Sequence, residues 1–275
     1  MLFNTFLHIP GIGAKTEKKI WLAGIQSWDQ WRPPFPSTLS GKIINLVTFH
    51  LQKFAAESNG TAAYYARLLP AGQLWRLFPH FRKQTAYLDI ETDGDRGTIT
   101  TIALADGQRL HTYVQGENLA DFLMDISTYE VIVTYNGTGF DLPVIESFFS
   151  TRLNQVHIDL RSILARLGYK GGLKACEKNA GIARPGLEGL DGFAAVLLWR
   201  RYRQAGDKAA LATLLAYNCA DAANLEHLLV HAYNRNIANT PFSQTNYIPH
   251  PPPPRIPFTP DQKTIARIRD ACLHC

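Results

Sequence analysis

Residues 85–91 read Thr-Ala-Tyr-Leu-Asp-Ile-Glu, and this stretch decides the fold. Polar and apolar side chains alternate at its end, which is typical of a β-strand because neighbouring side chains point to opposite faces. Leu88 and Ile90 therefore share one face, and Asp89 and Glu91 share the other. Two adjacent carboxylates repel each other unless a cation lies between them, and Mg²⁺-type cations prefer oxygen ligands. Taken alone, the stretch also fits a solvated polar face.

The segments that follow extend this strand into a sheet. Asp106-Gly107 favours a hairpin turn, and helices are predicted over 117–127 and from Asp141. The run 130–135 is apolar on both faces, as a central parallel strand is. The expected strands lie at 85–91, 98–104, 109–114, 130–135 and 156–158. Three antiparallel strands followed by alternating helices and strands predict an α/β protein with the ribonuclease H-like arrangement, a mixed sheet flanked by helices.

A second acidic residue follows the apolar run. Asn136 and Gly137 stand at the carboxyl end of the predicted parallel strand, where open sheets place their ligand sites. Asp141 begins the next helix, and Pro143 is tolerated in its first turn. A helix cap combined with a glycine turn is the alternative interpretation of this segment.

The third acidic motif is Tyr-Asn-Cys-Ala-Asp at 217–221, within a predicted helix. A spacing of four places Tyr217 and Asp221 on one helix face, which Leu214 and Leu225 continue. A carboxylate on a leucine-bearing face is uncommon unless another group pairs with it. An amphipathic edge position is the alternative.

The order of these motifs resembles the three exonuclease motifs of the DEDD superfamily, and the tyrosine of the third motif is the mark of its DEDDy branch. Residues 78–82 (FPHFR), 87–92 (YLDIET) and 135–137 (YNG) resemble the YprB-type ribonuclease H-like proteins. The likeness covers residues 65–235. The residues that match the motifs are Asp89, Glu91, Asp141, Tyr217 and Asp221.

The resemblance implies a 3′–5′ exonuclease that hydrolyses phosphodiester bonds of DNA or RNA with two Mg²⁺ or Mn²⁺ ions. It assigns Asp89 to bridge both metals and Glu91, Asp141 and Asp221 to complete the ligand set. Tyr217 is expected to orient the attacking water, because an unperturbed phenol stays protonated near pH 7 and is a poor base.

Three further residues are expected at the substrate. Asn136 and Phe140 are candidates for contact with the terminal nucleotide, Phe140 by stacking. Lys174 follows two glycines at a predicted helix start and is a candidate for contact with a phosphate. Turn and core roles for Asn136 and Phe140, and a plain loop around Lys174, are the alternatives.

The amino-terminal residues 9–20 (IPGIGAKTEKKI) resemble the turn and second helix of a helix-hairpin-helix motif. Gly11 and Gly13 would let backbone amides approach a phosphate at a helix amino end. Lys15 and the two lysines after it add attraction that salt weakens. A structural turn or a protein-docking element is the alternative.

Composition divides the chain into four parts. Residues 1–32 hold the helix-hairpin-helix-like element, and 33–84 hold a proline-rich linker and a helical segment. Residues 85–235 form the predicted exonuclease domain. Residues 236–275 are expected to be a proline-rich, disordered tail.

The overall composition narrows the class of protein. The chain has 275 residues, of which 46% are hydrophobic and 19% charged. No apolar run is long enough to cross a membrane, and the amino terminus lacks a signal-peptide pattern. With four cysteines, these features predict a cytoplasmic protein. A net charge of +5 suits a nucleic-acid partner. A structure-selective endonuclease and a non-catalytic nucleic-acid-binding scaffold remain open as alternatives.

Overall fold

The computed structural model describes residues 1–94 and 97–273, which form two compact units. Unit 1 consists of Met1–Arg82 and Tyr233–Ile248, and unit 2 consists of Lys83–Ala232 and the chain from Pro249 onward. The helices of the amino-terminal part are α1 (Ala14–Leu22), α2 (Gly41–Glu57), α3 (Ala62–Ala66) and α4 (Phe78–Phe81). The strands are β1 (Thr85–Thr92), β2 (Ile99–Ala105), β3 (Leu110–Val114), β4 (Val131–Thr134) and β5 (Val156–Asp159). The later helices are α5 (Phe122–Ile126), α6 (Asp141–Phe148), α7 (Leu160–Arg166), α8 (Leu173–Asn179), α9 (Gly192–Ala205), α10 (Lys208–Ile237) and α11 (Gln262–Leu273).

The five strands of unit 2 form one mixed sheet in the order β3-β2-β1-β4-β5. Strands β1, β2 and β3 pair antiparallel, whereas β4 and β5 pair parallel to β1 and to each other. Tyr87 lies opposite Val133 of β4, and Asp89 lies opposite Ala103 of β2. The predicted α/β class and mixed sheet are confirmed.

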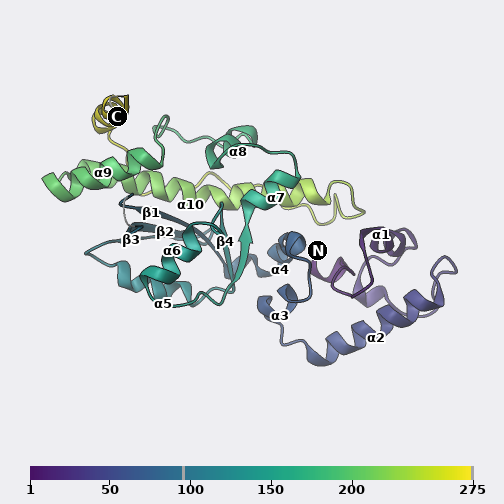
Figure 1. Ribbon diagram of the computed structural model, residues 1–275. Coiled ribbons are helices and arrows are strands. Elements are labelled where there is room, and N and C mark those ends of the chain that lie inside the picture. The colour runs from purple at the N-terminus through teal and green to yellow at the C-terminus, as the bar shows by residue number, and fades with distance from the viewer. Residues whose placement is uncertain (95–96, 274–275) are drawn as a thin grey trace. The chain divides into compact units, whose positions relative to one another are not determined.

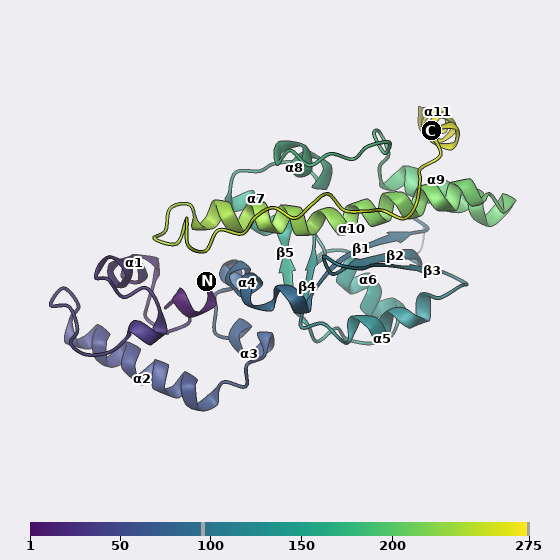
Figure 2. The same ribbon diagram turned by 180° about the vertical axis from the view of Figure 1, so that it is seen from behind.

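Helices cover both faces of the sheet. Figures 1 and 2 show α5 and α6 on one face, and α10 crossing the other face with α9 beside it. Leu88 and Ile90 of β1 belong to the apolar cluster that includes Phe122 of α5 and Ile145 of α6. The strand alternation therefore directs Asp89 and Glu91 to the α10 face.

Helix α10 approaches the sheet closely at the centre. Ala103 of β2 packs against Cys219 and Ala222 of α10, and all three are fully buried. These small side chains let the helix axis lie near the strands. The acidic residues of β1 consequently face the middle of α10, where Asp221 is located.

The loop after β4 is a tight turn fixed by two residues. Asn136 has a left-handed backbone conformation with φ 68°, and the Gly137 N–H donates to Thr134 Oγ1 at 3.0 Å. A Cβ atom at Gly137 would lie 2.1 Å from Thr134 Oγ1, so a larger residue cannot fit there. The turn joins the end of β4 at Thr134 to the start of α6 at Asp141.

Unit 1 is built around a buried carboxylate. Glu17 of α1 accepts hydrogen bonds from Thr5 Oγ1 at 2.6 Å and from the Phe6 N–H at 2.8 Å. It also forms an ion pair with Arg76, whose Nη2 lies 3.0 Å from Glu17 Oε2. Lys15 and Lys18 stay exposed on the other side of the helix. The charged residues of this segment thus divide into a structural acid and solvent-facing lysines.

Two segments differ from the expected organisation. Residues 1–32 and 33–82 pack into one unit, in which Trp31 Nε1 donates to Thr48 Oγ1 at 3.0 Å. The expected disordered tail contains the end of α10 and the helix α11, which packs on α9. Ile265 and Ile268 of α11 are buried there. The prolines at 251–254 favour an extended chain, but the residues after them follow an amphipathic helical pattern and form α11.

Candidate metal centre

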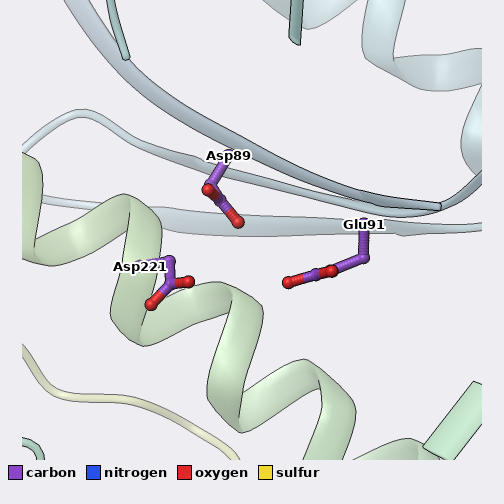
Figure 3. A group of neighbouring side chains, drawn as sticks. All are labelled: Asp89, Glu91 and Asp221. Carbon is purple, nitrogen blue, oxygen red and sulfur yellow. The ribbon is translucent and has the colours of Figure 1, made fainter. Parts of the chain in front are cut away.

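Three carboxylates from two elements meet between the sheet and α10. Asp89 and Glu91 come from β1 and Asp221 from α10, and one carboxylate oxygen of each lies within 4.8 Å of the others (Figure 3). Asp221 is 6% exposed and Glu91 9% exposed. The strand alternation and the helical position predicted from the sequence therefore converge in one place.

The electrostatics of this group favour a bound cation. Burial raises the pKa of Asp89 well above its ordinary value, and repulsion from Asp221 and Glu91 adds to the shift. Burial and Asp221 likewise raise the pKa of Glu91, while the cations Lys174 and Arg184 oppose this. An oxygen-only donor set of carboxylates matches the preference of Mg²⁺ and Mn²⁺. The residues present fit such an ion.

Asp141 lies beside this group but outside it. It is the first residue of α6, it is 4% exposed, and its carboxylate accepts a hydrogen bond from the Ile90 backbone N–H. Burial raises its pKa to about 7, and charge repulsion from Asp159 and Asp221 acts in the same direction. Asp141 begins the helix at the residue that the sequence analysis expected, but its oxygens do not join those of Asp89, Glu91 and Asp221.

Tyr217 and Lys174 form a hydrogen-bonded pair near the third carboxylate. Lys174 Nζ of α8 donates to the Tyr217 hydroxyl at 2.5 Å, and Nζ lies 4.4 Å from the centre of the Tyr217 ring. The Tyr217 hydroxyl is hydrogen-bonded to Asp221. Burial, with Asp221 and Glu91 nearby, raises the pKa of Tyr217, so the phenol stays protonated. This arrangement makes Tyr217 a hydrogen-bond donor in the site.

Sequence reasoning missed Asn218, the residue after Tyr217. It is fully buried, and its Nδ2 donates to Asp89 Oδ2 at 2.7 Å and to the Asp89 carbonyl oxygen at 3.1 Å. The available signal was its helical position three residues before Asp221, which places both on the inner face of α10.

Arg184 and Glu177 were also missed. The Arg184 side chain, in the loop between α8 and α9, forms ion pairs with Glu177 of α8 and with Asp221. Glu177 is 1% exposed and also accepts from Asn224 Nδ2 at 3.0 Å. A single acid inside the short apolar pattern of α8 was the available signal, because a fully buried carboxylate needs a partner.

The predicted substrate residues take different positions. Asn136 follows β4, and its side-chain Oδ1 accepts a hydrogen bond from Arg161 Nη1 at 2.5 Å. The backbone N–H of Asn136 donates to Asp159 Oδ1 at 2.8 Å. Phe140 precedes α6 and is 43% exposed. Gly11, Gly13 and Lys15 belong to unit 1, where Gly13 caps the amino end of α1.

A family model for the RNase_H superfamily matches residues 86–233, which is more than half of the chain. The protein belongs to this superfamily. The match begins in β1 and ends in α10, so it spans the three carboxylates of the centre.

A solved structure, the family B DNA polymerase from the hyperthermophilic archaeon Pyrobaculum calidifontis, is similar over 60% of this chain and 27% of that chain. The sequences are 15% identical and the TM-score is 0.43. A search of the curated proteins found no match. No helix in the described residues is both long and apolar enough to cross a bilayer.

Proposed function

We propose that this protein is a metal-dependent nuclease of the DEDDy type that removes nucleotides from the 3′ end of a nucleic acid. The observation that carries the proposal is the meeting of Asp89, Glu91 and Asp221, with one oxygen of each within 4.8 Å of the others. Membership of the RNase_H superfamily supports it. Nucleic acid, DNA or RNA, is the proposed substrate.

Asp89, Glu91 and Asp221 would hold Mg²⁺ or Mn²⁺, and Asp141 beside β1 would complete a ligand set for two ions. Divalent ions bound here would lower the pKa of a coordinated water, which makes it a better nucleophile, and would offset the charge that builds on the phosphate and the leaving oxygen. Four ionised carboxylates balance the charge of two divalent ions, so the ligands and the ions together are neutral.

The remaining residues would position water and substrate. The Tyr217 hydroxyl, held between Lys174 and Asp221, would orient the attacking water through a hydrogen bond. Lys174 would also offer its charge to a phosphate. The exposed Phe140 ring is available for stacking on the terminal base, and Asn136 would contact the same nucleotide.

In unit 1, the turn with Gly11 and Gly13 and the exposed Lys15 would bind the nucleic-acid backbone, as expected for a helix-hairpin-helix-like element. We place the protein among the YprB-type members on the motifs given above. A cytoplasmic location agrees with the free thiols of Cys176 and Cys219.

The test uses a single-stranded oligonucleotide labelled at its 5′ end, with Mg²⁺ or Mn²⁺. A ladder that shortens by one nucleotide at a time from the 3′ end supports the proposal. Internal cuts would indicate an endonuclease on the same site, and binding without cleavage would indicate a scaffold protein. Either result replaces the exonuclease assignment.

Variants of the centre assign the activity to it. Asp89→Ala and Asp221→Ala should each abolish metal-dependent cleavage and leave the fold intact by circular dichroism. Asp121→Ala is the matched control, because Asp121 is an exposed acid of the same domain. Full activity in either of the first two variants would remove the assignment.

A further inference from the structure

A buried arginine reaches the metal centre from outside the acidic motifs. The Arg184 side chain is 9% exposed and donates through Nη2 to Glu177 Oε1 at 2.9 Å, with Nε on the other Glu177 oxygen. The same Nη2 forms an ion pair with Asp221 Oδ1. One guanidinium therefore joins α8 to a proposed metal ligand on α10.

Glu177 anchors Arg184 to α8 and α10, while Arg184 Nη1 is buried without a hydrogen-bond partner. Glu177 takes its third hydrogen bond from Asn224 Nδ2, and Asn224 lies three residues after Asp221 on the same face of α10. The loop that carries Arg184 and helix α8 are thus bonded to α10 at two residues, Asp221 and Asn224. Such an arrangement restricts the side-chain rotamer of Asp221, because the fork held by both Glu177 oxygens presents Nη2 to Asp221 from one direction.

An ordinary buried ion pair serves as the comparison within this chain. Glu17 and Arg76 form an equally buried pair in unit 1, where neither residue contacts Asp89, Glu91 or Asp221. The Glu177–Arg184 pair differs because its guanidinium also bonds a carboxylate of the metal group. In Figure 3 the Asp221 carboxylate lies across from Asp89 and Glu91, so a change in its orientation changes the ligand set.

We propose that Arg184, held by Glu177, is a positioning residue that orients Asp221 and thereby sets the affinity of the centre for divalent metal. The inference rests on the proposed function, since it needs Asp221 to be a ligand. Groups that orient metal ligands typically change metal affinity about 10–100-fold when they are removed. We expect a loss of that size here.

The experiment measures Mn²⁺ binding to the full-length protein by titration calorimetry. The double variant Glu177→Gln/Arg184→Met removes one negative and one positive charge, so it separates orientation from net charge. Arg184→Lys keeps the charge and loses the fork. Both should bind Mn²⁺ about 10–100-fold more weakly than wild type. Glu17→Gln/Arg76→Met, the matched control, should bind as wild type does.

Two further readouts keep the test decisive. Asn224→Ala removes only one hydrogen bond to Glu177, so it should give a smaller loss of Mn²⁺ affinity. If the Arg184 variants do not fold, this loss tests the positioning role, and wild-type affinity in Asn224→Ala would then overturn it. Where cleavage is measured, raising the Mn²⁺ concentration should restore the kcat of Arg184→Lys, because the catalytic residues remain.

The outcomes separate this inference from the proposed function. Wild-type affinity in the double variant, or in Arg184→Lys, would overturn the positioning role while leaving the metal centre in place. A wild-type protein that binds no Mn²⁺ would instead overturn the metal centre itself.

Discussion

Asn218 of α10 donates its side-chain amide to Asp89 Oδ2 at 2.7 Å and to the Asp89 carbonyl oxygen at 3.1 Å, across 129 positions of sequence. Both bonds originate from one fully buried Nδ2 atom. The amide therefore fixes the carboxylate relative to its own backbone and ties α10 to β1. The first acidic residue of the centre is oriented by the helix that supplies the third.

Asn218→Ala should release the Asp89 carboxylate. A hydrogen bond to a charged group contributes about 1.5–3 kcal/mol, so the free energy of unfolding should fall by that order. Mn²⁺ binding should weaken as well, and calorimetry with urea denaturation measures both. Asn234→Ala is the control, because Asn234 Nδ2 bonds the Ile248 carbonyl oxygen in unit 1. Equal Mn²⁺ affinity in both variants would contradict the orienting role.

Asp89→Asn should raise the melting temperature of the metal-free protein and lower that of the protein with Mn²⁺, each relative to wild type. Without metal, the substitution relieves repulsion from Glu91 and Asp221, so the melting temperature in EDTA should rise. With Mn²⁺, the wild type should gain about 2.7 kcal/mol at a hundredfold excess over Kd, and the variant should gain little. Thermal melts in EDTA and in Mn²⁺ measure the crossover. A variant that melts below wild type in EDTA would show that Asp89 is not repelled by its neighbours.

The sequence predicted the acids of the centre because each follows a regular pattern. Alternation on β1 placed Asp89 and Glu91 on one face, and a spacing of four placed Tyr217 and Asp221 together. The order of strands and helices was predictable for the same reason, since period and turn chemistry are local properties. These residues required no knowledge of distant contacts.

The partners of those acids could not be predicted in this way. Arg184 lies in a loop without periodicity, and its contact with Asp221 depends on how α8 packs against α10. Asp141 was predicted as a fourth ligand, and its carboxylate accepts a hydrogen bond from the Ile90 N–H and lies outside the group of three. Such distances depend on packing rather than on a sequence pattern.

Tyr217→Phe should lower kcat much more than it lowers metal affinity, because Arg184 still contacts Asp221 in the variant. The variant loses the hydroxyl that is hydrogen-bonded to Asp221 and accepts a hydrogen bond from Lys174 Nζ. The energy of a hydrogen bond to a charged group corresponds to about a 10–100-fold change in rate. Because the pKa of Tyr217 is raised, the wild-type rate should show no phenol titration between pH 6 and 10. Single-turnover cleavage across that range, together with Mn²⁺ titration, measures these effects. An alkaline limb present in wild type and absent in the variant would instead indicate that Tyr217 acts as a base.

The metal-free protein should lose stability as the pH rises. The folded-state pKa of Asp141 is about 7, above its ordinary value of 3.8, so the folded state holds this proton more tightly than the unfolded state does. The resulting stabilisation is complete below about pH 4 and is lost as the pH rises through 7. Asp89 and Glu91 add to this trend, because burial raises the pKa of both.

Urea denaturation in EDTA at pH 5 and pH 8.5 measures this trend. Asp141→Asn should reduce the difference between the two pH values, because the amide does not titrate and its Oδ1 still accepts the Ile90 N–H. Mg²⁺ should also reduce it, because the bound cation favours the ionised carboxylates. A wild-type stability that increases from pH 5 to pH 8.5 would contradict the raised pKa values.

The lysines of α1 should contribute to nucleic-acid binding through charge alone. Lys15, Lys18 and Lys19 are exposed, so neutralising them leaves the buried Glu17 network intact. Each lost phosphate contact makes the plot of log K against log salt less steep by about 0.7 for a single strand. The triple change of these lysines to Gln should therefore lower the slope by about 2. Fluorescence anisotropy with a labelled oligonucleotide, on an Asp89→Asn background in EDTA, measures it.

A control with the same loss of charge separates a specific contact from general attraction. Lys42, Lys53 and Lys83 are also exposed and lie outside the glycine turn, so their triple change to Gln alters net charge equally. The salt slope should stay near the wild-type value in this control, because the slope counts displaced counterions at the contact and not the total charge. If the change of Lys15, Lys18 and Lys19 leaves the slope at the wild-type value, the glycine turn and α1 are a structural element, and nucleic acid is bound elsewhere on the chain.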